Sequence, residues 1–279
     1  MMNIDAENAL KELLSKGIKL PAQPKVLIEL QSKLGSDRYS MRDLSRIISS
    51  DPGISAMLFK VARSPVFGTN KRFDTIEQVL MLIGIKQTYN LVMAISLSSS
   101  ISDANRKSFE IFWNRSQEVA QIAALIATDR VSVCNIFPDQ AYMAGIFHEC
   151  GVPVLMLRFP DYCQKLNLDT TTCWPSLTEE DAHFNVDHCS IGYFVARHWQ
   201  LPNFVCQAIL YHHEMPQERL GAVRTLVAIL QLAIHFHHRI TQTEHFVWWN
   251  IREEALAELG IPAEAEQAYF EEVSEQFLG

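Results

Sequence analysis

The chain has 279 residues, a formal net charge of −8 and a hydrophobic fraction of 48%. A chain of this length and composition can bury a substantial core, so we expect a globular protein of one large domain or two packed subdomains. The longest apolar stretches, 91–101 and 223–236, are too short or too polar to supply the roughly 20 residues that cross a bilayer, and no membrane helix is expected. The N-terminus lacks the features of a secretory signal, which favours a cytoplasmic location.

Two further features of the composition limit the possible partners and redox chemistry. The acidic charge repels phosphate backbones, so nucleic acid is an unfavourable partner. The cysteines form no C-x-x-C pair and stand mostly among apolar residues, where free Cys behaves as a small hydrophobic residue. We therefore expect reduced core thiols at Cys134, Cys150, Cys163, Cys173, Cys189 and Cys206.

Helix start signals recur at short intervals in the first hundred residues. Ser40 and Asp43 have the spacing of a capping box. The Asp-Pro pair at 51–52 starts another helix, because the carboxylate accepts amide protons and proline has none to leave unpaired. The apolar spacing places Leu58 and Leu82 on buried helix faces. In chain order, the expected helices cover about 6–16, from 24, 40–50, from 51, 75–83 and 87–98.

The polar segment 98–107 is the best candidate for an internal boundary. No segment alternates strictly between apolar and polar residues, so the sequence predicts an all-α fold. We expect an N-terminal helical subdomain over 1–105, packed on a subdomain over 106–279 that includes a C-terminal helical extension. The helices expected in this second part cover about 107–130, 138–148, 202–212, 223–238 and 263–277, and another helix contains Ser190 and ends near 199.

A series of short motifs runs in order along most of the chain. In this order and spacing they resemble the HDOD family, a regulatory branch of the HD superfamily of metal-dependent phosphohydrolases. The resemblance covers about 20–213 and implies a multi-helical HD-like fold in a bacterial signal-transduction protein; the segment after Arg239 takes no part in it. The motifs are L-P at 20–21 with Pro24, I-I-S-S-D-P-G-I at 47–54, A-R-S-P-V-F-G at 62–68, T-I-E-Q-V-L-M-L-I-G at 75–84, F-W at 112–113 with Ser116, A-G-I-F-H-E-C-G at 144–151, His188, W-Q-L-P at 199–202 and H-H at 212–213.

The resemblance also assigns the positions of the HD metal site, where one His, a His-Asp pair and a later Asp hold a divalent metal that activates water. These positions correspond to Arg115, His148, Glu149 and Ile234. A guanidinium is cationic and has no lone pair, and a hydrocarbon side chain coordinates nothing, so two of the four positions are lost. His148 and Glu149 keep a nitrogen and a carboxylate. If the positions still converge, we expect Arg115 and Glu149 to form an ion pair in the former metal cavity.

Additional histidines leave a substitute metal site open as an alternative. Its candidate ligands are His148, Glu149, His188, His212 and His213, since HD-GYP relatives recruit extra histidines in this part of the fold. Against it, neighbouring His212 and His213 would project about 100° apart on a helix. An isolated His at helical spacing is also more often a packed or solvent-facing residue. His235 and His238, in contrast, share a face of the helix expected over 223–238.

The eroded HD positions favour a non-catalytic HDOD-type regulatory domain that acts through protein partners and needs no cofactor. The alternative is a metal-dependent phosphohydrolase that uses a modified His/Glu site with a divalent metal. Gly151-Val152-Pro153 follows the His-Glu pair, and no Gly-Tyr-Pro motif occurs, which argues against cleavage of cyclic dinucleotides. A helix-turn-helix at 40–64 is a third possibility, disfavoured because basic residues are few. The oligomeric state is left open.

Overall fold

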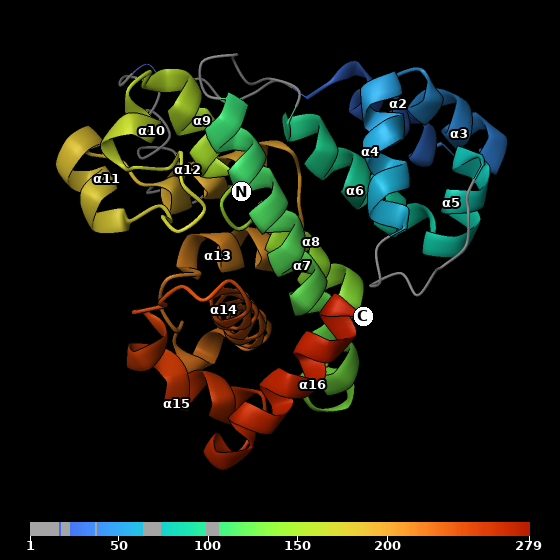
Figure 1. Ribbon diagram of the computed structural model, residues 1–279. Coiled ribbons are helices and arrows are strands. Elements are labelled where there is room, and N and C mark those ends of the chain that lie inside the picture. Colours follow the sequence, from blue (N-terminus) through green and yellow to red (C-terminus); the bar gives the residue numbers. More distant parts are fainter. Residues whose placement is uncertain (1–16, 18–22, 37, 64–73, 99–105) are drawn as a thin grey trace.

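The computed structural model describes residue 17 and residues 23–36, 38–63, 74–98 and 106–279. Within these ranges it contains helices and turns but no strand, which confirms the all-α prediction. The helix expected at 6–16 lies outside the described residues. Figure 1 shows one group of helices formed by the N-terminal part and a larger group formed by the rest of the chain. No helix in the described part of the chain has the length and apolar character needed to cross a bilayer.

The N-terminal group begins its helices at the predicted caps. The amide of Asp43 donates to Ser40 Oγ at 3.2 Å, and the amide of Ser40 donates to Asp43 Oδ2 at 3.0 Å. The amide of Ile54 donates to Asp51 Oδ1 at 3.0 Å. Both start signals are therefore confirmed. The helices are α2 (Lys25–Leu34), α3 (Met41–Ser49), α4 (Pro52–Ala62), α5 (Ile76–Ile83) and α6 (Ile85–Ser98).

The two leucines expected in the core of this group differ in burial. Leu58 on α4 is 0% exposed, but Leu82 on α5 is 42% exposed. The expectation for Leu82 was wrong because the buried stripe of α5 consists of other residues at helical spacing, and Leu82 lies beside it. The stripe is formed by Ile76, Val79, Leu80 and Ile83.

This difference in burial predicts different mutational costs. Leu58→Ala is expected to lower the free energy of unfolding by roughly 2–5 kcal/mol, because it empties a buried site. Leu82→Ala is expected to cost less than about 1 kcal/mol, since much of that side chain already contacts water. Denaturant unfolding of both variants measures the difference. Similar losses at the two positions would contradict the packing of α5.

The second group contains the predicted helices and several that the sequence analysis missed. The missed helices are α9 (Gly151–Arg158), α10 (Tyr162–Lys165), α11 (Leu177–Phe184) and α15 (Trp248–Glu258). α15 follows Val247, which provides no side-chain cap, so its start carries no recognisable signal. The other elements are α7 (Arg106–Cys134), α8 (Pro138–Phe147), α12 (His188–His198), α13 (Asn203–Tyr211), η3 (Glu218–Leu220), α14 (Ala222–Ile240), η4 (Ala263–Ala265) and α16 (Glu266–Leu278).

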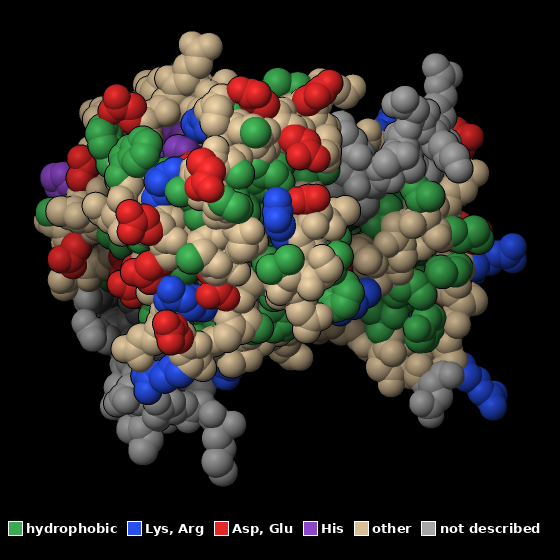
Figure 2. Space-filling model, turned by 90° about the horizontal axis from the view of Figure 1, so that it is seen from below, with side chains coloured by type: hydrophobic (Ala, Val, Ile, Leu, Met, Phe, Trp, Pro, Cys, Tyr) green, Lys and Arg blue, Asp and Glu red, His purple; other side chains and the backbone are tan. Residues whose placement is uncertain are grey.

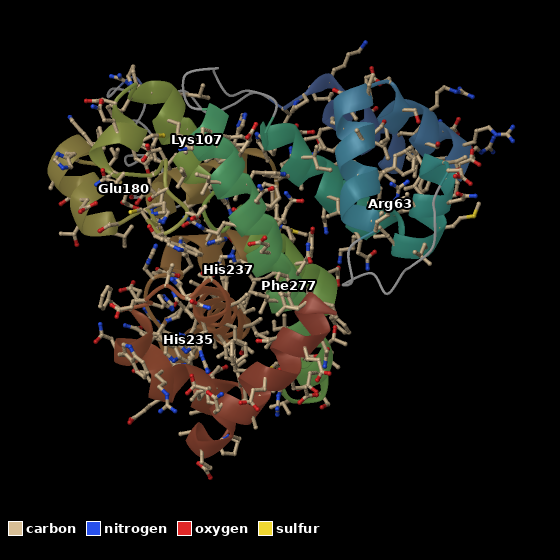
Figure 3. The ribbon with its side chains drawn as sticks, in the orientation of Figure 1. Arg63, Lys107, Glu180, His235, His237 and Phe277 are labelled. Atoms are coloured by element: carbon tan, nitrogen blue, oxygen red, sulfur yellow. The ribbon has the colours of Figure 1, made fainter. Side chains whose placement is uncertain are left out.

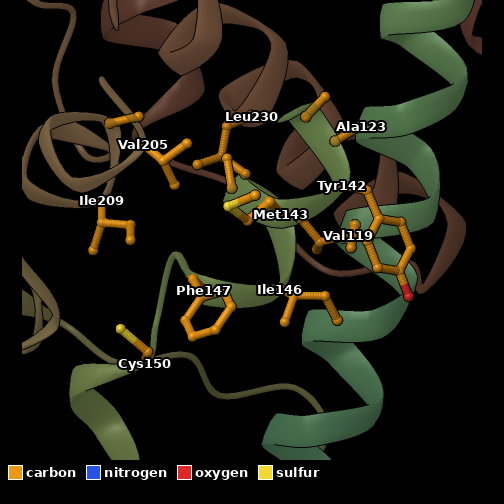
Figure 4. Packing of buried hydrophobic residues seen from close by; sticks show 14 of the residues in the cluster. Val119, Ala123, Tyr142, Met143, Ile146, Phe147, Cys150, Val205, Ile209 and Leu230 are labelled. Atoms are coloured by element: carbon orange, nitrogen blue, oxygen red, sulfur yellow. The ribbon is translucent and has the colours of Figure 1, made fainter. Parts of the chain in front are cut away.

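The helix α14 forms the centre of the second group. All residues of α14 from Thr225 to His238 are buried, and α7, α8, α13, α15 and α16 pack around it. Figure 4 shows part of this core, where side chains of α7, α8, α13 and α14 interlock. α8 approaches α7 closely at Gly145, where a Cβ would lie 2.4 Å from the Ala120 Cα. This packing holds the end of α8, and therefore His148, against α13.

Candidate metal centre

Three histidine side chains meet where the start of α12 faces the end of α13. His188 is the first residue of α12, and His212 and His213 directly follow α13. The Nε2 atom of His188 lies 3.3 Å from the Nε2 of His212 and 3.0 Å from the Nε2 of His213. The thiol of Cys189 lies 3.6 Å from the same His188 nitrogen. This is the one cluster of three or more metal-capable side chains found within the described ranges.

The partners of the Nδ1 atoms determine the direction of the lone pairs. His188 Nδ1 lies 2.7 Å from Glu180 Oε2, and His212 Nδ1 lies 2.7 Å from the carbonyl oxygen of Ile209. Because both oxygens are hydrogen-bond acceptors, each Nδ1 carries the hydrogen and donates it, and each Nε2 of a neutral ring carries the lone pair. The lone pairs of His188 and His212 therefore point into one small space, which favours a positive charge between them.

The spacing fits a metal ion. Tetrahedral coordination with metal–nitrogen bonds of about 2.0–2.1 Å separates two ligand nitrogens by about 3.3–3.4 Å. The distances from His188 Nε2 to the two neighbouring Nε2 atoms, 3.3 and 3.0 Å, are close to this value. The donor set of the three histidines therefore fits a transition-metal ion.

The pKa values also indicate that this site attracts one positive charge. Burial lowers the pKa of His188, but Cys189 and Glu180 outweigh it and raise the pKa well above its usual value. Burial and neighbouring histidines hold the pKa values of His212 and His213 well below normal. Because a histidine binds metal through a deprotonated nitrogen, protonation of His188 competes with metal binding, and metal binding should weaken as the pH falls.

A buried carboxylate orients the first ligand. Glu180 on α11 is 0% exposed and accepts from both the backbone amide of His188, at 2.9 Å, and the hydroxyl of Tyr162. Figure 3 labels Glu180 among the helices that lie above α13. Metal-binding histidines commonly donate their second ring N–H to such a carboxylate. The sequence analysis missed Glu180, because the acidic run at 179–181 looks like the exposed first turn of a helix.

Three of the four positions that the resemblance assigns to the HD site lie beside this cluster. A cavity of about 410 Å³ is lined by His148, Glu149 and Ile234 together with His212 and His213. These three side chains therefore face one space. His148 Nε2 and Glu149 Oε2 are buried, lie 3.9 Å apart and have no hydrogen-bond partner. Buried polar atoms without partners that line a cavity are suited to a bound ion, water or ligand group.

The expected ion pair between Arg115 and Glu149 does not form within 4.0 Å. The Nη2 of Arg115 instead donates to the carbonyl oxygens of Cys173, at 2.8 Å, and Thr171, at 3.3 Å. Its guanidinium lies 4.1 Å from the ring centre of Trp174, a residue of the cavity wall. The expectation was wrong because the segment 171–174 supplies acceptors and a ring directly beside Arg115. Arg115 therefore supports the wall of the cavity.

The structure also shows where the other histidines discussed above lie. α13 ends at Tyr211, so His212 and His213 lie in a turn and the angle of successive helix residues does not separate them. Both rings approach His188 Nε2, at 3.3 and 3.0 Å, and their binding of one metal stays a prediction. His235 instead stacks on Trp248 at 4.6 Å, and His238 stacks on Trp174 at 4.4 Å. These two residues of α14 do not join the cluster.

Two buried histidines of α14 and a half-buried histidine in the following turn predict acid sensitivity. Burial, with neighbouring His245, lowers the pKa of His235 and of His238 to about 3, and burial lowers that of His245 to about 4. The unfolded chain binds their protons near pH 6.5 and the folded chain does not, so stability is present above pH 6.5 and is lost as the pH falls. We expect a loss of roughly 1–2 kcal/mol per histidine between pH 7 and pH 5. Urea unfolding at several pH values measures it, and equal stability at both would contradict the burial of these rings.

Comparison with known protein families shows that the family model of the HDOD domain matches residues 20–215 of this chain. An uncharacterized protein of Treponema pallidum (strain Nichols) is 24% identical over 220 residues; the match covers 78% of this chain but 42% of that protein. The chain therefore spans less than half of that relative.

Solved structures share the fold at low identity. An HDOD domain protein of unknown function from Geobacter sulfurreducens is 22% identical, covers 99% of both chains and has a TM-score of 0.63. A protein from Shewanella amazonensis SB2B, provisionally assigned as a metal-dependent phosphohydrolase, is 18% identical, covers 98% of this chain and 97% of its own, and has a TM-score of 0.68. A protein from Marinobacter aquaeolei VT8, provisionally assigned to signal transduction, is 20% identical, covers 98% of this chain and 63% of its own, and has a TM-score of 0.65.

Proposed function

The chain belongs to the HDOD domain family, and we propose that it is a bacterial signalling domain that binds one divalent transition-metal ion at His188, His212 and His213. It acts through protein contacts and does not perform HD-type phosphate hydrolysis. The observation that carries the metal proposal is the convergence of the three Nε2 atoms at 3.0 and 3.3 Å. The division into subdomains at 105/106 is part of this proposal.

The three ligands favour particular metals. Imidazole nitrogen suits zinc, copper, iron and nickel, whereas magnesium and calcium prefer oxygen ligands. The thiol of Cys189, 3.6 Å from His188 Nε2, could supply a fourth ligand and would favour zinc further. A bound ion supplies a crosslink between the start of α12 and the end of α13. In a regulatory domain, such a crosslink stiffens the surface on which a partner docks.

The absence of HD-type hydrolysis follows from the donor chemistry of the cavity. Ile234 lines it with hydrocarbon where the HD pattern requires a carboxylate. Arg115 is buried outside the lining of the cavity, where it donates to the carbonyls of Thr171 and Cys173, and a guanidinium has no lone pair to offer a metal. A water-activating metal therefore lacks two of its four usual ligands.

One observation favours a second candidate function, metal-dependent phosphohydrolysis at a displaced site. The cavity that His212 and His213 share with His148 and Glu149 has a volume of about 410 Å³, which is large enough for a small substrate. The unpartnered His148 Nε2 and Glu149 Oε2 could then act as proton acceptors beside the metal. A regulatory domain does not require these two groups to be reactive.

Hydrolysis assays separate the two functions. We expect no appreciable turnover of cyclic dinucleotides, nucleotides or generic phosphodiesters when magnesium, manganese, iron or zinc is supplied. The triple variant Arg115→His, Glu149→Asp, Ile234→Asp is expected to bind additional metal, because it supplies the donor types of the HD pattern at the three changed positions. Metal analysis and titration measure this gain. Turnover by the natural chain that disappears with chelator or with His148→Ala, and returns with metal, would establish the second function.

A further inference from the structure

The C-terminal segment carries the net charge of the whole chain. Residues 241–279 contain nine glutamates, one arginine and no aspartate or lysine, so their formal charge of −8 equals that of all 279 residues. They lie beyond the HDOD match, which ends at residue 215. Figure 2 shows the face below α15 and α16, where acidic side chains outnumber basic ones over the left and central parts.

A groove on this segment exposes two aromatic side chains. It has a volume of about 700 Å³ and lies between the end of α14, the start of α15 and the turn that leads into α16. His235 lines it, and the ring of Trp249 meets that of His235 edge-on at 6.2 Å. Trp249 is 70% exposed and Phe246 is 73% exposed. Exposed aromatic rings that line one groove are typical of a binding surface.

The arginines of the groove already have partners. Arg252 Nε donates to Glu266 Oε2 at 2.6 Å, and its Nη2 donates to the carbonyl oxygen of Ala263 at 3.0 Å. Arg239 donates to Gln267 and lies 3.6 Å from the ring centre of Phe270. These two cations are therefore poor binding groups for an added anion.

The carboxylates at the rim are unpaired. Glu244 and Glu264 line the groove, are exposed, and have no ion-pair partner within 4.0 Å among the residues that the structure describes. His235 adds no charge at neutral pH, because burial lowers its pKa to about 3. The lining holds three carboxylates against two guanidiniums, so the groove combines a net negative charge with aromatic faces, which is the arrangement that binds organic cations.

We propose that this groove binds a basic segment of a partner protein, with an arginine or lysine side chain on Trp249 and its charge beside Glu244 and Glu264. An aliphatic neighbour in the segment covers Phe246. The acidic residues around the groove attract a basic segment over a long range, and they repel the phosphate backbone of nucleic acid. The proposal rests on the role in signalling through protein contacts, and it is independent of the metal centre.

The test uses a short fluorescein-labelled peptide of alternating arginine and leucine, measured by fluorescence anisotropy with the full chain. Binding is expected to weaken about 5- to 30-fold with Trp249→Ala, since the cation–π contact is lost. The double variant Glu244→Lys, Glu264→Lys should weaken it at least as much. A peptide with glutamate in place of arginine should not bind, and spermine should compete poorly because it leaves Phe246 uncovered.

The matched control is the double variant Glu253→Lys, Glu272→Lys, which makes the same change in charge at exposed positions outside the groove. It is expected to bind the peptide within about 2-fold of the natural chain at physiological salt, because screening limits distant charges. Equal weakening by both double variants, no effect of Trp249→Ala in a folded chain, or no binding would overturn the proposal. The metal content of the same samples is measured as well, so that a failure of peptide binding can be told apart from a failure of the metal proposal.

Discussion

The His212→Ala variant is expected to contain almost no bound metal under conditions in which the natural chain binds about one ion. His212 is 1% exposed, and its Nδ1–H is committed to the Ile209 carbonyl oxygen, so its Nε2 is directed toward His188. Loss of one of three nitrogen ligands removes the basis of a tetrahedral site. Elemental analysis after equilibration with zinc measures the loss.

Two further variants test the same centre. Glu180→Gln keeps the size of the side chain but removes the charge that supports His188, and it is expected to weaken metal binding about 10- to 100-fold. His198→Ala removes an exposed histidine from the far end of α12 and should leave affinity unchanged. Equal metal content in His212→Ala and His198→Ala would contradict the assignment of the ligands.

Gly151→Ala is expected to destabilise the fold by more than about 3 kcal/mol, because it overpacks a contact between backbones. A Cβ at Gly151 would lie 2.1 Å from the carbonyl oxygen of His188 and 2.8 Å from the amide nitrogen of Gly192. Neither is the end of a flexible side chain, so α9 and α12 must separate. The start of α12 would move with them, and any folded remainder should bind metal more weakly.

Chemical denaturation compares this variant with Gly53→Ala. Gly53 is exposed in the first turn of α4, and a Cβ there would approach only the Asp51 side chain, at 3.3 Å. We expect a change within about 1 kcal/mol at that control position. A Gly151→Ala chain as stable as the natural one would show that α9 does not approach α12 as closely as described.

The parts of the fold that follow from local chemistry could be predicted from the sequence. The caps at Ser40 and Asp51 act within three residues, and their hydrogen bonds are present as expected. α15 could not be predicted, because its N-cap is Val247 and its stability comes from packing on α14. The exposure of Leu82 likewise depends on which stripe of α5 meets the core.

The metal cluster was only partly predictable, because its geometry also depends on how distant segments pack. The resemblance identified His188, His212 and His213 as candidates, but the end of α13 at Tyr211 decides that the last two can share a centre. Glu180 is eight residues before His188, and only the fold brings its carboxylate to the ring. The contacts of Arg115 with the segment 171–174 are set by side chains more than fifty residues apart in sequence.

X-ray absorption spectroscopy of the natural chain, purified without a His tag and supplied with zinc, identifies the ligand atoms of the bound ion. We expect about one ion per chain, bound by three imidazole nitrogens at about 2.0–2.1 Å, with room for sulfur at about 2.3 Å. A chain that binds no zinc, or binds it through oxygen ligands alone, would contradict the proposal that His188, His212 and His213 form a metal centre.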